Sequence, residues 1–267
     1  PCADNRNEVI LVGSFLEDDV IEHINDNNNI HPILNYQLPK DIKVIKFSEF
    51  NDTIKENIDL IVVGVSSKGI EWVGEELSKF YNEKTNILLL TKGLAVIENQ
   101  FETLADKLEK ILNKNGTTNP KISAVGGPCL ASGLANRIKS SVVLASKNIE
   151  IVKEIGKIIS TSYYSTEFTE DLIGVEVCAA TKNIYSMLIG ASEGLSGNNI
   201  DGEIKKKYYL NTAASLIYKS LSEMKKFTKK LKGKEETVFG LAGLGDLHVS
   251  AAGGRNSMMG NYLGKGL

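Results

Sequence analysis

Short apolar runs alternate with amphipathic segments over the first 170 residues, and this alternation limits the folds that the chain can adopt. Runs rich in Val, Ile and Leu predict strands at residues 8–13, 42–47, 59–65, 86–90, 121–125 and 141–145, and Tyr-Tyr-Ser-Thr at residues 163–166 predicts a last strand. Helical spacing predicts helices at residues 17–27, 48–56, 68–81, 101–113, from 130 onward, and 149–159. Strands that alternate with helices indicate crossover connections. We therefore expect an α/β fold with a doubly wound, mostly parallel sheet.

The pattern changes at residue 171, after which no further strand is predicted. Helical spacing predicts helices at residues 174–195, 204–230 and 235–241. We place the domain boundary near residues 169–171. The sequence thus predicts a sheet domain over residues 1–170 and an all-α second domain over residues 171–267.

The helix predicted at residues 174–195 carries a lysine among apolar neighbours. Its positions at helical spacing are Val175, Ala179, Lys182, Ser186 and Ile189. The opposite side is also apolar, so we expect this helix to be buried. Burial disfavours the charged form of a lysine, which makes Lys182 a candidate for proton chemistry. The alternative, in which its stem covers apolar surface and its ammonium reaches water, stays open at this point.

Composition and spacing argue against several classes of partner. The net charge is -2 and both signs are interspersed, so no basic field predicts nucleic-acid binding. The cysteines and histidines are Cys2, Cys129, Cys178, His23, His31 and His248. Their wide spacing matches neither a disulfide framework nor a metal site. We see no apolar run near membrane-spanning length, and we expect a soluble, cytoplasmic protein.

One part of a dinucleotide-binding sheet is absent from the sequence. Such a sheet opens with a strand and a Gly-x-Gly-x-x-Gly turn that holds the pyrophosphate. No strand is predicted before residue 8, and residues 4–7 are typical of a helix end that leads into a second strand. We infer a Rossmann-like sheet whose first strand and glycine turn are missing. A different α/β fold that never had this turn is the alternative.

Four segments together resemble the NAD-dependent glycerol-3-phosphate dehydrogenase family over essentially the whole chain. They are Thr91-Lys92-Gly93, residues 126–131, residues 174–183 from Gly-Val-Glu to Thr-Lys-Asn, and Gly-Leu-Gly-Asp-Leu at 243–247 with Gly-Gly-Arg-Asn at 253–256. The third and fourth segments are specific in combination. By this resemblance the chain lacks the N-terminal glycine-rich loop and the last C-terminal helices of the family.

The resemblance implies hydride transfer between a nicotinamide cofactor and dihydroxyacetone phosphate, which gives glycerol 3-phosphate reversibly. Lys182 would then be the proton donor to the developing alkoxide, and Asp246 its carboxylate partner. Lys92 would place a second positive charge near the reacting oxygen and would contact both substrate and cofactor.

Further positions follow from the same resemblance. Asn183 would bind a substrate hydroxyl, and Arg255 and Asn256 would grip the substrate phosphate. Arg255 would also reach toward the cofactor, and Ser250 is a weaker candidate for the substrate site. Ala131 matches a cofactor contact of the family.

Some residues depart from the family pattern, and other functions stay open. Cys129 stands where relatives commonly carry a polar residue, and Ser66 replaces a common proline. Residues 13–16 hold no arginine, so we expect NAD, with NADP possible. A ketopantoate-type or hydroxyacid dehydrogenase and a non-catalytic module on the same fold are the alternatives. We also expect a homodimer and, because the glycine turn is missing, weak binding of NADH by this chain alone.

Overall fold

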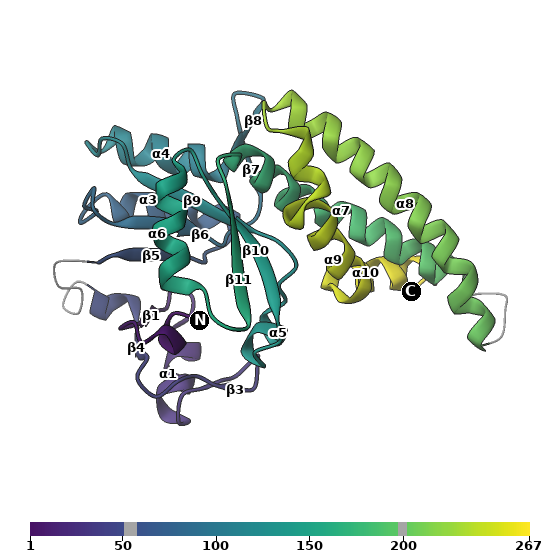
Figure 1. The fold of residues 1–267 in the computed structure, drawn as a ribbon. Coiled ribbons are helices and arrows are strands. Elements are labelled where there is room, and N and C mark those ends of the chain that lie inside the picture. Colours follow the sequence, from purple (N-terminus) through teal and green to yellow (C-terminus); the bar gives the residue numbers. More distant parts are fainter. Residues whose placement is uncertain (51–57, 197–201) are drawn as a thin grey trace.

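The computed structural model describes residues 1–50, 58–196 and 202–267. Figure 1 shows a sheet-containing part and, on one side of it, a bundle of helices that ends at the C-terminus. The predicted helix at residues 48–56 lies largely outside the described residues, which hold the 3₁₀ turn Phe47–Glu49 and the helical residue Phe50 there.

A five-stranded sheet forms the centre of the first part. Its strands, in spatial order, are β11 (Tyr164–Thr169), β10 (Ser140–Ser146), β9 (Lys121–Gly126), β6 (Asn86–Leu89) and β5 (Leu60–Val63). Three of the four pairings are parallel, as the sequence predicts, and β9 with β10 is antiparallel. The chain between these two strands contains only α5 (Ala131–Ala135). Five helical residues span about 8 Å, too little to return along the sheet and start a parallel strand.

Helices cover both faces of this sheet. They are α3 (Ile70–Leu77), α4 (Leu104–Lys114) and α6 (Ile149–Ile159), with the 3₁₀ turn Ser67–Gly69 before α3. Ile87 and Leu89 of β6 pack with α3 and α4, whereas Leu88 packs with α6 on the other face. This period of two along a fully buried strand confirms the predicted doubly wound arrangement.

Three pairs of short strands lie outside the central sheet. β1 (Ile10–Val12) pairs in parallel with β4 (Lys43–Ile45) against α1 (Asp18–Asp26), after the 3₁₀ turn Ala3–Asn5. Two hairpins join β2 (Ile30–His31) to β3 (Tyr36–Gln37) and β7 (Leu94–Ile97) to β8 (Gln100–Thr103). Among the described residues, β1 and β4 share no strand pairing with β5, although the sequence places them in one sheet with a strand missing.

The predicted helix at residues 101–113 is wrong at its start, because β8 occupies residues 100–103. Glu98 and Asn99 both have positive φ, at 50° and 60°, which makes a two-residue turn that suits a hairpin. Neither is a glycine, so the sequence carries only a weak signal for this turn.

The second part is helical throughout its described residues. It contains α7 (Leu172–Ser196), α8 (Gly202–Lys230), α9 (Asp246–Gly253) and α10 (Arg255–Gly264). The predicted helix at 235–241 is instead a 3₁₀ turn, η4 (Glu235–Phe239), followed by a π turn, η5 (Leu241–Gly245), that leads into α9.

The long helix α7 is buried on one side only. Val175, Ala179, Lys182, Ser186 and Ile189 are all buried, as the sequence predicts. The prediction that the helix is buried all round is wrong, because Ile184 and Leu188 are 58% and 49% exposed. By length and composition α7 could cross a membrane. The sequence-based expectation that no apolar run approaches membrane-spanning length is therefore wrong for α7. Yet 61% of its apolar window is buried within the protein, as in a core helix.

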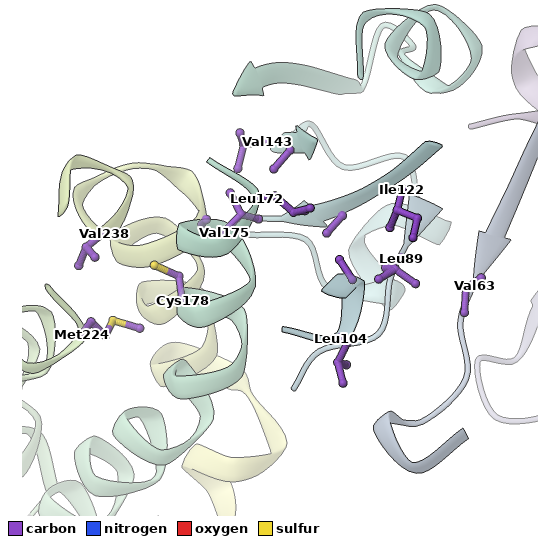
Figure 2. Close-up of a cluster of buried hydrophobic side chains, with 14 of the residues drawn as sticks. Val63, Leu89, Leu104, Ile122, Val143, Leu172, Val175, Cys178, Met224 and Val238 are labelled. Carbon is purple, nitrogen blue, oxygen red and sulfur yellow. The ribbon is translucent and has the colours of Figure 1, made fainter. Parts of the chain in front are cut away.

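One hydrophobic cluster joins the two parts of the molecule (Figure 2). It runs from Leu89 and Leu104, through Val175 and Cys178 of α7, to Met224 of α8. Because these side chains form one continuous core, the helices are held in fixed positions against the edge of the sheet.

α7 and α10 pack backbone against backbone through glycines. A Cβ added at Gly190 of α7 would lie 2.0 Å from the carbonyl oxygen of Ser257, and one at Gly260 of α10 would lie 1.9 Å from that of Met187. A backbone oxygen in a packed helix cannot move aside cheaply.

We expect Gly190→Ala to lower the free energy of unfolding by about 3 kcal/mol, because the helices must separate. Urea denaturation measures this change. The control is Gly133→Ala in α5, where the nearest atom to the added Cβ is that of Ile138 at 4.0 Å. Equal effects of the two substitutions would contradict the close packing of α7 on α10.

Candidate active site

The loop that carries Lys92 lies at the carboxyl edge of the parallel strands. It follows β6 directly, and the hydroxyl of Thr91 donates a hydrogen bond of 2.7 Å to the carbonyl oxygen of Val65, just beyond β5. Gly93 has φ of 154°, and a Cβ there would lie 3.1 Å from Cβ of Ser67. These constraints fix the backbone on both sides of Lys92. Ligands of such sheets bind at this edge.

A buried carboxylate joins this loop to the helical part. Asp246 is 1% exposed, and its Oδ2 lies 3.1 Å from Nζ of Lys92. Its Oδ1 accepts a hydrogen bond from Nζ of Lys182, which is also buried. Asp246 is the first residue of α9, which continues directly from η5. One carboxylate therefore holds together the loop after β6, α7 and α9.

Glycines let the segment before Asp246 approach its neighbours. A Cβ at Gly243 would lie 2.0 Å from the carbonyl oxygen of Val238, and one at Gly126 would lie 2.8 Å from Cγ1 of Val175 and 3.0 Å from Cβ of Ala242. Gly243 therefore lets η5 approach η4, and Gly126 lets β9 approach α7 and η5.

The environment of Lys182 favours loss of its proton. Burial and, to a smaller extent, the positive charge of Lys92 together lower the pKa of Lys182 from the ordinary 10.5 to about 8, against the opposing effect of Asp246. An amine with a pKa near neutrality can both give and take a proton at physiological pH. This supports the proton chemistry predicted for Lys182 over the interpretation as a lysine that reaches into water.

No hydrogen bond to Asp246 is described for the other predicted site residues. Asn183 follows Lys182 on α7 and is half-buried, and Ser250 is buried in α9. Arg255 begins α10 and is exposed, next to the half-buried Asn256. Ala131 begins α5 and is exposed. None of the ion pairs of the described residues includes Arg255.

Cys129 is half-buried beside this cluster. Burial raises the pKa of the Cys129 thiol, so at neutral pH it is a small, uncharged side chain. It therefore adds no negative charge where the family pattern has a polar residue.

Sequence reasoning missed two features of the site. The ion pair between Lys92 and Asp246 was not predicted, since Lys92 was placed near the substrate oxygen and Asp246 was paired with Lys182 alone. Glu176 belongs to the Gly-Val-Glu motif, but no role was predicted for it. It is buried on α7, and only the fold reveals what it contacts.

The carboxyl edge of the sheet fits the reactive end of a dinucleotide. Gly64, which follows β5, has no atom within 4 Å of its Cβ position, so its backbone is open to a ligand. Gly127, after β9, has φ of 130°, which favours glycine. No Gly-x-Gly-x-x-Gly turn occurs among the described residues, and we assign no residue to the pyrophosphate.

We expect Asp246→Asn to destabilise the protein in a pH-dependent way. Because the folded-state pKa of Lys182 is below its unfolded value, the folded protein binds fewer protons between them, and its stability rises with pH in that range. Without Asp246 the buried ammonium loses its counter-ion, which costs about 3–5 kcal/mol at about pH 6. At about pH 9.5 Lys182 is mostly neutral, so the loss of stability caused by Asp246→Asn becomes smaller.

Urea denaturation at both pH values measures this difference. Asp4→Asn makes the same chemical change at the exposed ion pair with Arg137, and we expect a much smaller loss there. A loss for Asp246→Asn that does not change with pH would contradict the pairing with Lys182.

Comparison with known proteins identifies the family. The model of the NAD-dependent glycerol-3-phosphate dehydrogenase N-terminus matches residues 1–152, and that of the C-terminus matches residues 171–267. The NADP(+)-dependent glycerol-3-phosphate dehydrogenase of Archaeoglobus fulgidus is 30% identical over 268 residues, which covers 100% of this chain and 76% of that protein. A glycerol-3-phosphate dehydrogenase [NAD(P)+] of Clostridium botulinum is 30% identical over 251 residues, which covers 93% of this chain and 69% of that protein.

A solved structure agrees with these sequence matches. The crystal structure of glycerol-3-phosphate dehydrogenase from Coxiella burnetii superposes with a TM-score of 0.81 at 27% identity. The match covers 100% of this chain and 75% of that one. Since both family models match and a relative at 30% identity covers the whole chain, the chain belongs to the NAD-dependent glycerol-3-phosphate dehydrogenase family.

Proposed function

We propose that this protein transfers hydride between NAD(H), with NADP(H) also possible, and the middle carbon of dihydroxyacetone phosphate, to give sn-glycerol 3-phosphate reversibly. The family supports this reaction over a ketopantoate-type dehydrogenase or a non-catalytic module. The observation that carries the mechanism is Asp246, buried between Lys92 and Lys182 at the carboxyl edge of the sheet.

In our proposal Lys182 is the acid and base of the reaction. The bound nicotinamide supplies or accepts the hydride. In the reducing direction the Lys182 ammonium gives a proton to the carbonyl oxygen as that oxygen becomes an alkoxide, and the neutral amine then regains a proton from water. In the oxidising direction the amine removes the hydroxyl proton.

Asp246 and Lys92 support this proton transfer. Asp246 holds the Lys182 ammonium in one place, so the proton is oriented toward the substrate oxygen before the reaction begins. Lys92 adds a fixed positive charge in a partly buried site, where it stabilises negative charge on the substrate oxygen more strongly than in water. Both lysines share one carboxylate, which leaves a net positive site for an anionic substrate.

The remaining site assignments are also proposals. Arg255 and Asn256 would hold the substrate phosphate, which suits an exposed arginine at the start of α10. Asn183, next to Lys182, would hold a substrate hydroxyl, and Ser250 is a weaker candidate for the substrate site. Lys92, Ala131 and Arg255 would contact the cofactor.

We propose that residues 1–170 bind the cofactor and residues 171–267 the substrate. The end of β11 at Thr169 and the start of α7 at Leu172 support this division. We further propose a homodimer in the cytoplasm. Exposed apolar side chains of α7 and α10, among them Leu188 and Leu263, support self-association, and three free cysteines suit a reducing compartment.

The first test is the pH dependence of turnover by the product of the complete reading frame. For reduction of dihydroxyacetone phosphate by NADH we expect kcat to fall as pH rises through about 8, because Lys182 loses the proton that it must donate. For oxidation of glycerol 3-phosphate we expect kcat to rise over the same range.

Lys182→Ala should lower kcat by about 10²- to 10⁴-fold and abolish this pH dependence. Lys153→Met removes an exposed lysine of α6 and should leave kcat unchanged. Full turnover by the Lys182 variant would refute the assignment of the acid and base.

Arg255→Ala should raise KM for dihydroxyacetone phosphate about 10- to 150-fold, because a charged hydrogen bond to the phosphate is lost. Steady-state kinetics with varied substrate measures this. Arg137→Ala removes another arginine, one that pairs with Asp4 on the surface, and should leave KM unchanged. If both variants keep the wild-type KM, Arg255 does not bind the phosphate.

A further inference from the structure

Glu176 is a buried carboxylate that the proposed mechanism does not use. It lies on α7, is 4% exposed, and precedes Lys182 by six residues, which is about 9 Å along a helix. Its Oε1 accepts hydrogen bonds from the backbone N–H groups of Leu104, at 3.1 Å, and Ala105, at 3.2 Å. Burial raises the pKa of Glu176 to about 8 in spite of these donors, with Asp106 the nearby charge that adds to the increase.

These two N–H groups are the first of α4. The third, that of Asp106, donates to the hydroxyl of Thr103, the N-cap of the helix. The free donors at this helix start are therefore satisfied partly by its own cap and partly by Glu176, a residue 72 positions away from Leu104 on another helix.

The hairpin β7–β8 connects this contact to the active site. Leu94 pairs directly with Thr103, so the strand that begins two residues after Lys92 is hydrogen-bonded beside the start of α4. A second contact holds the same hairpin against the helical part, since the ring of Phe101 meets that of Phe227 on α8 at 5.4 Å between centroids.

A closed chain of contacts results. α7 carries Lys182 directly, and through Glu176 it also holds the helix start and the hairpin that lead back to Lys92. The two lysines then meet on Asp246. We propose that Glu176 is a positioning residue that sets the place of Lys92 relative to Lys182. This inference rests on the function proposed above for the two lysines.

A purely structural role for Glu176 would make a different prediction. Loss of two satisfied N–H groups would destabilise the protein and leave the active site of the folded molecules unchanged. If Glu176 positions Lys92, its loss also changes the field at Lys182. The charged groups that act on Lys182 are Lys92, which lowers its pKa, and Asp246, which raises it. If Lys92 moves away from Lys182, the pKa of Lys182 should therefore rise.

The test is the pH at which kcat for reduction is half lost, measured on the product of the complete reading frame. We expect Glu176→Ala to move this pH upward to the value of Lys92→Ala, and the Lys92→Ala Glu176→Ala double variant to show no further shift. Glu176→Gln keeps an oxygen that can accept both N–H groups and should stay near wild type. Leu108→Ala opens a cavity in the core of α4 and serves as the control that is destabilised without a shift.

Each outcome decides between the two roles. If Lys92→Ala shifts the profile and Glu176→Ala leaves it in place, the positioning role is wrong and the proposed function stands. If Lys92→Ala itself causes no shift, the proposed role of Lys92 fails first. Should Glu176→Ala not fold, Glu176→Asp takes its place, because its shorter side chain keeps the carboxyl group and loses reach. A shift for that variant supports the proposal, and a loss of stability without a shift overturns it.

Discussion

The sharing of one buried carboxylate by two lysines is the interaction on which the rest of the structure depends. Removing Asp246 from water is unfavourable unless its charge is compensated by well-placed partners. Those partners come from a loop after β6 and from the middle of α7, so the sheet and the helical part must meet at a fixed distance. The continuous hydrophobic cluster between them supplies that rigidity (Figure 2). The site and the core therefore depend on each other.

Close backbone approach is what lets the helical part be so compact around the site. α7 touches α10 through Gly190 and Gly260, and η5 touches η4 and β9 through Gly243 and Gly126. At each position a side chain would collide with a neighbouring backbone or core atom. The glycines of the family motifs therefore serve packing as much as catalysis. They bring the start of α9, with its carboxylate, to the point where the two lysines can reach it.

Periodicity alone predicted the doubly wound sheet and the burial of the α7 positions that carry Lys182, but it wrongly predicted burial of the opposite side of α7 and left open whether Lys182 reaches water. It could not predict the β7–β8 hairpin, whose turn is made by Glu98 and Asn99, or the antiparallel β10, whose direction depends on the length of α5. The π turn at η5 has no periodic signal of its own. Within the site, the partners of Glu176 are backbone N–H groups, which every residue but proline carries. Such a contact is visible only once the fold is known.

The shared carboxylate also explains why a second lysine is useful. If Asp246 were paired with Lys182 alone, the Lys182 ammonium would hold its proton more tightly, and the pKa of Lys182 would be higher. Lys92 opposes this effect in two ways, since it competes for Asp246 and repels the Lys182 ammonium directly. Burial and this repulsion together bring the pKa to about 8, where the proton is held firmly enough to be present and loosely enough to be given. The distance between the two lysines thus sets the acidity of the site, and whatever fixes that distance acts on the chemistry.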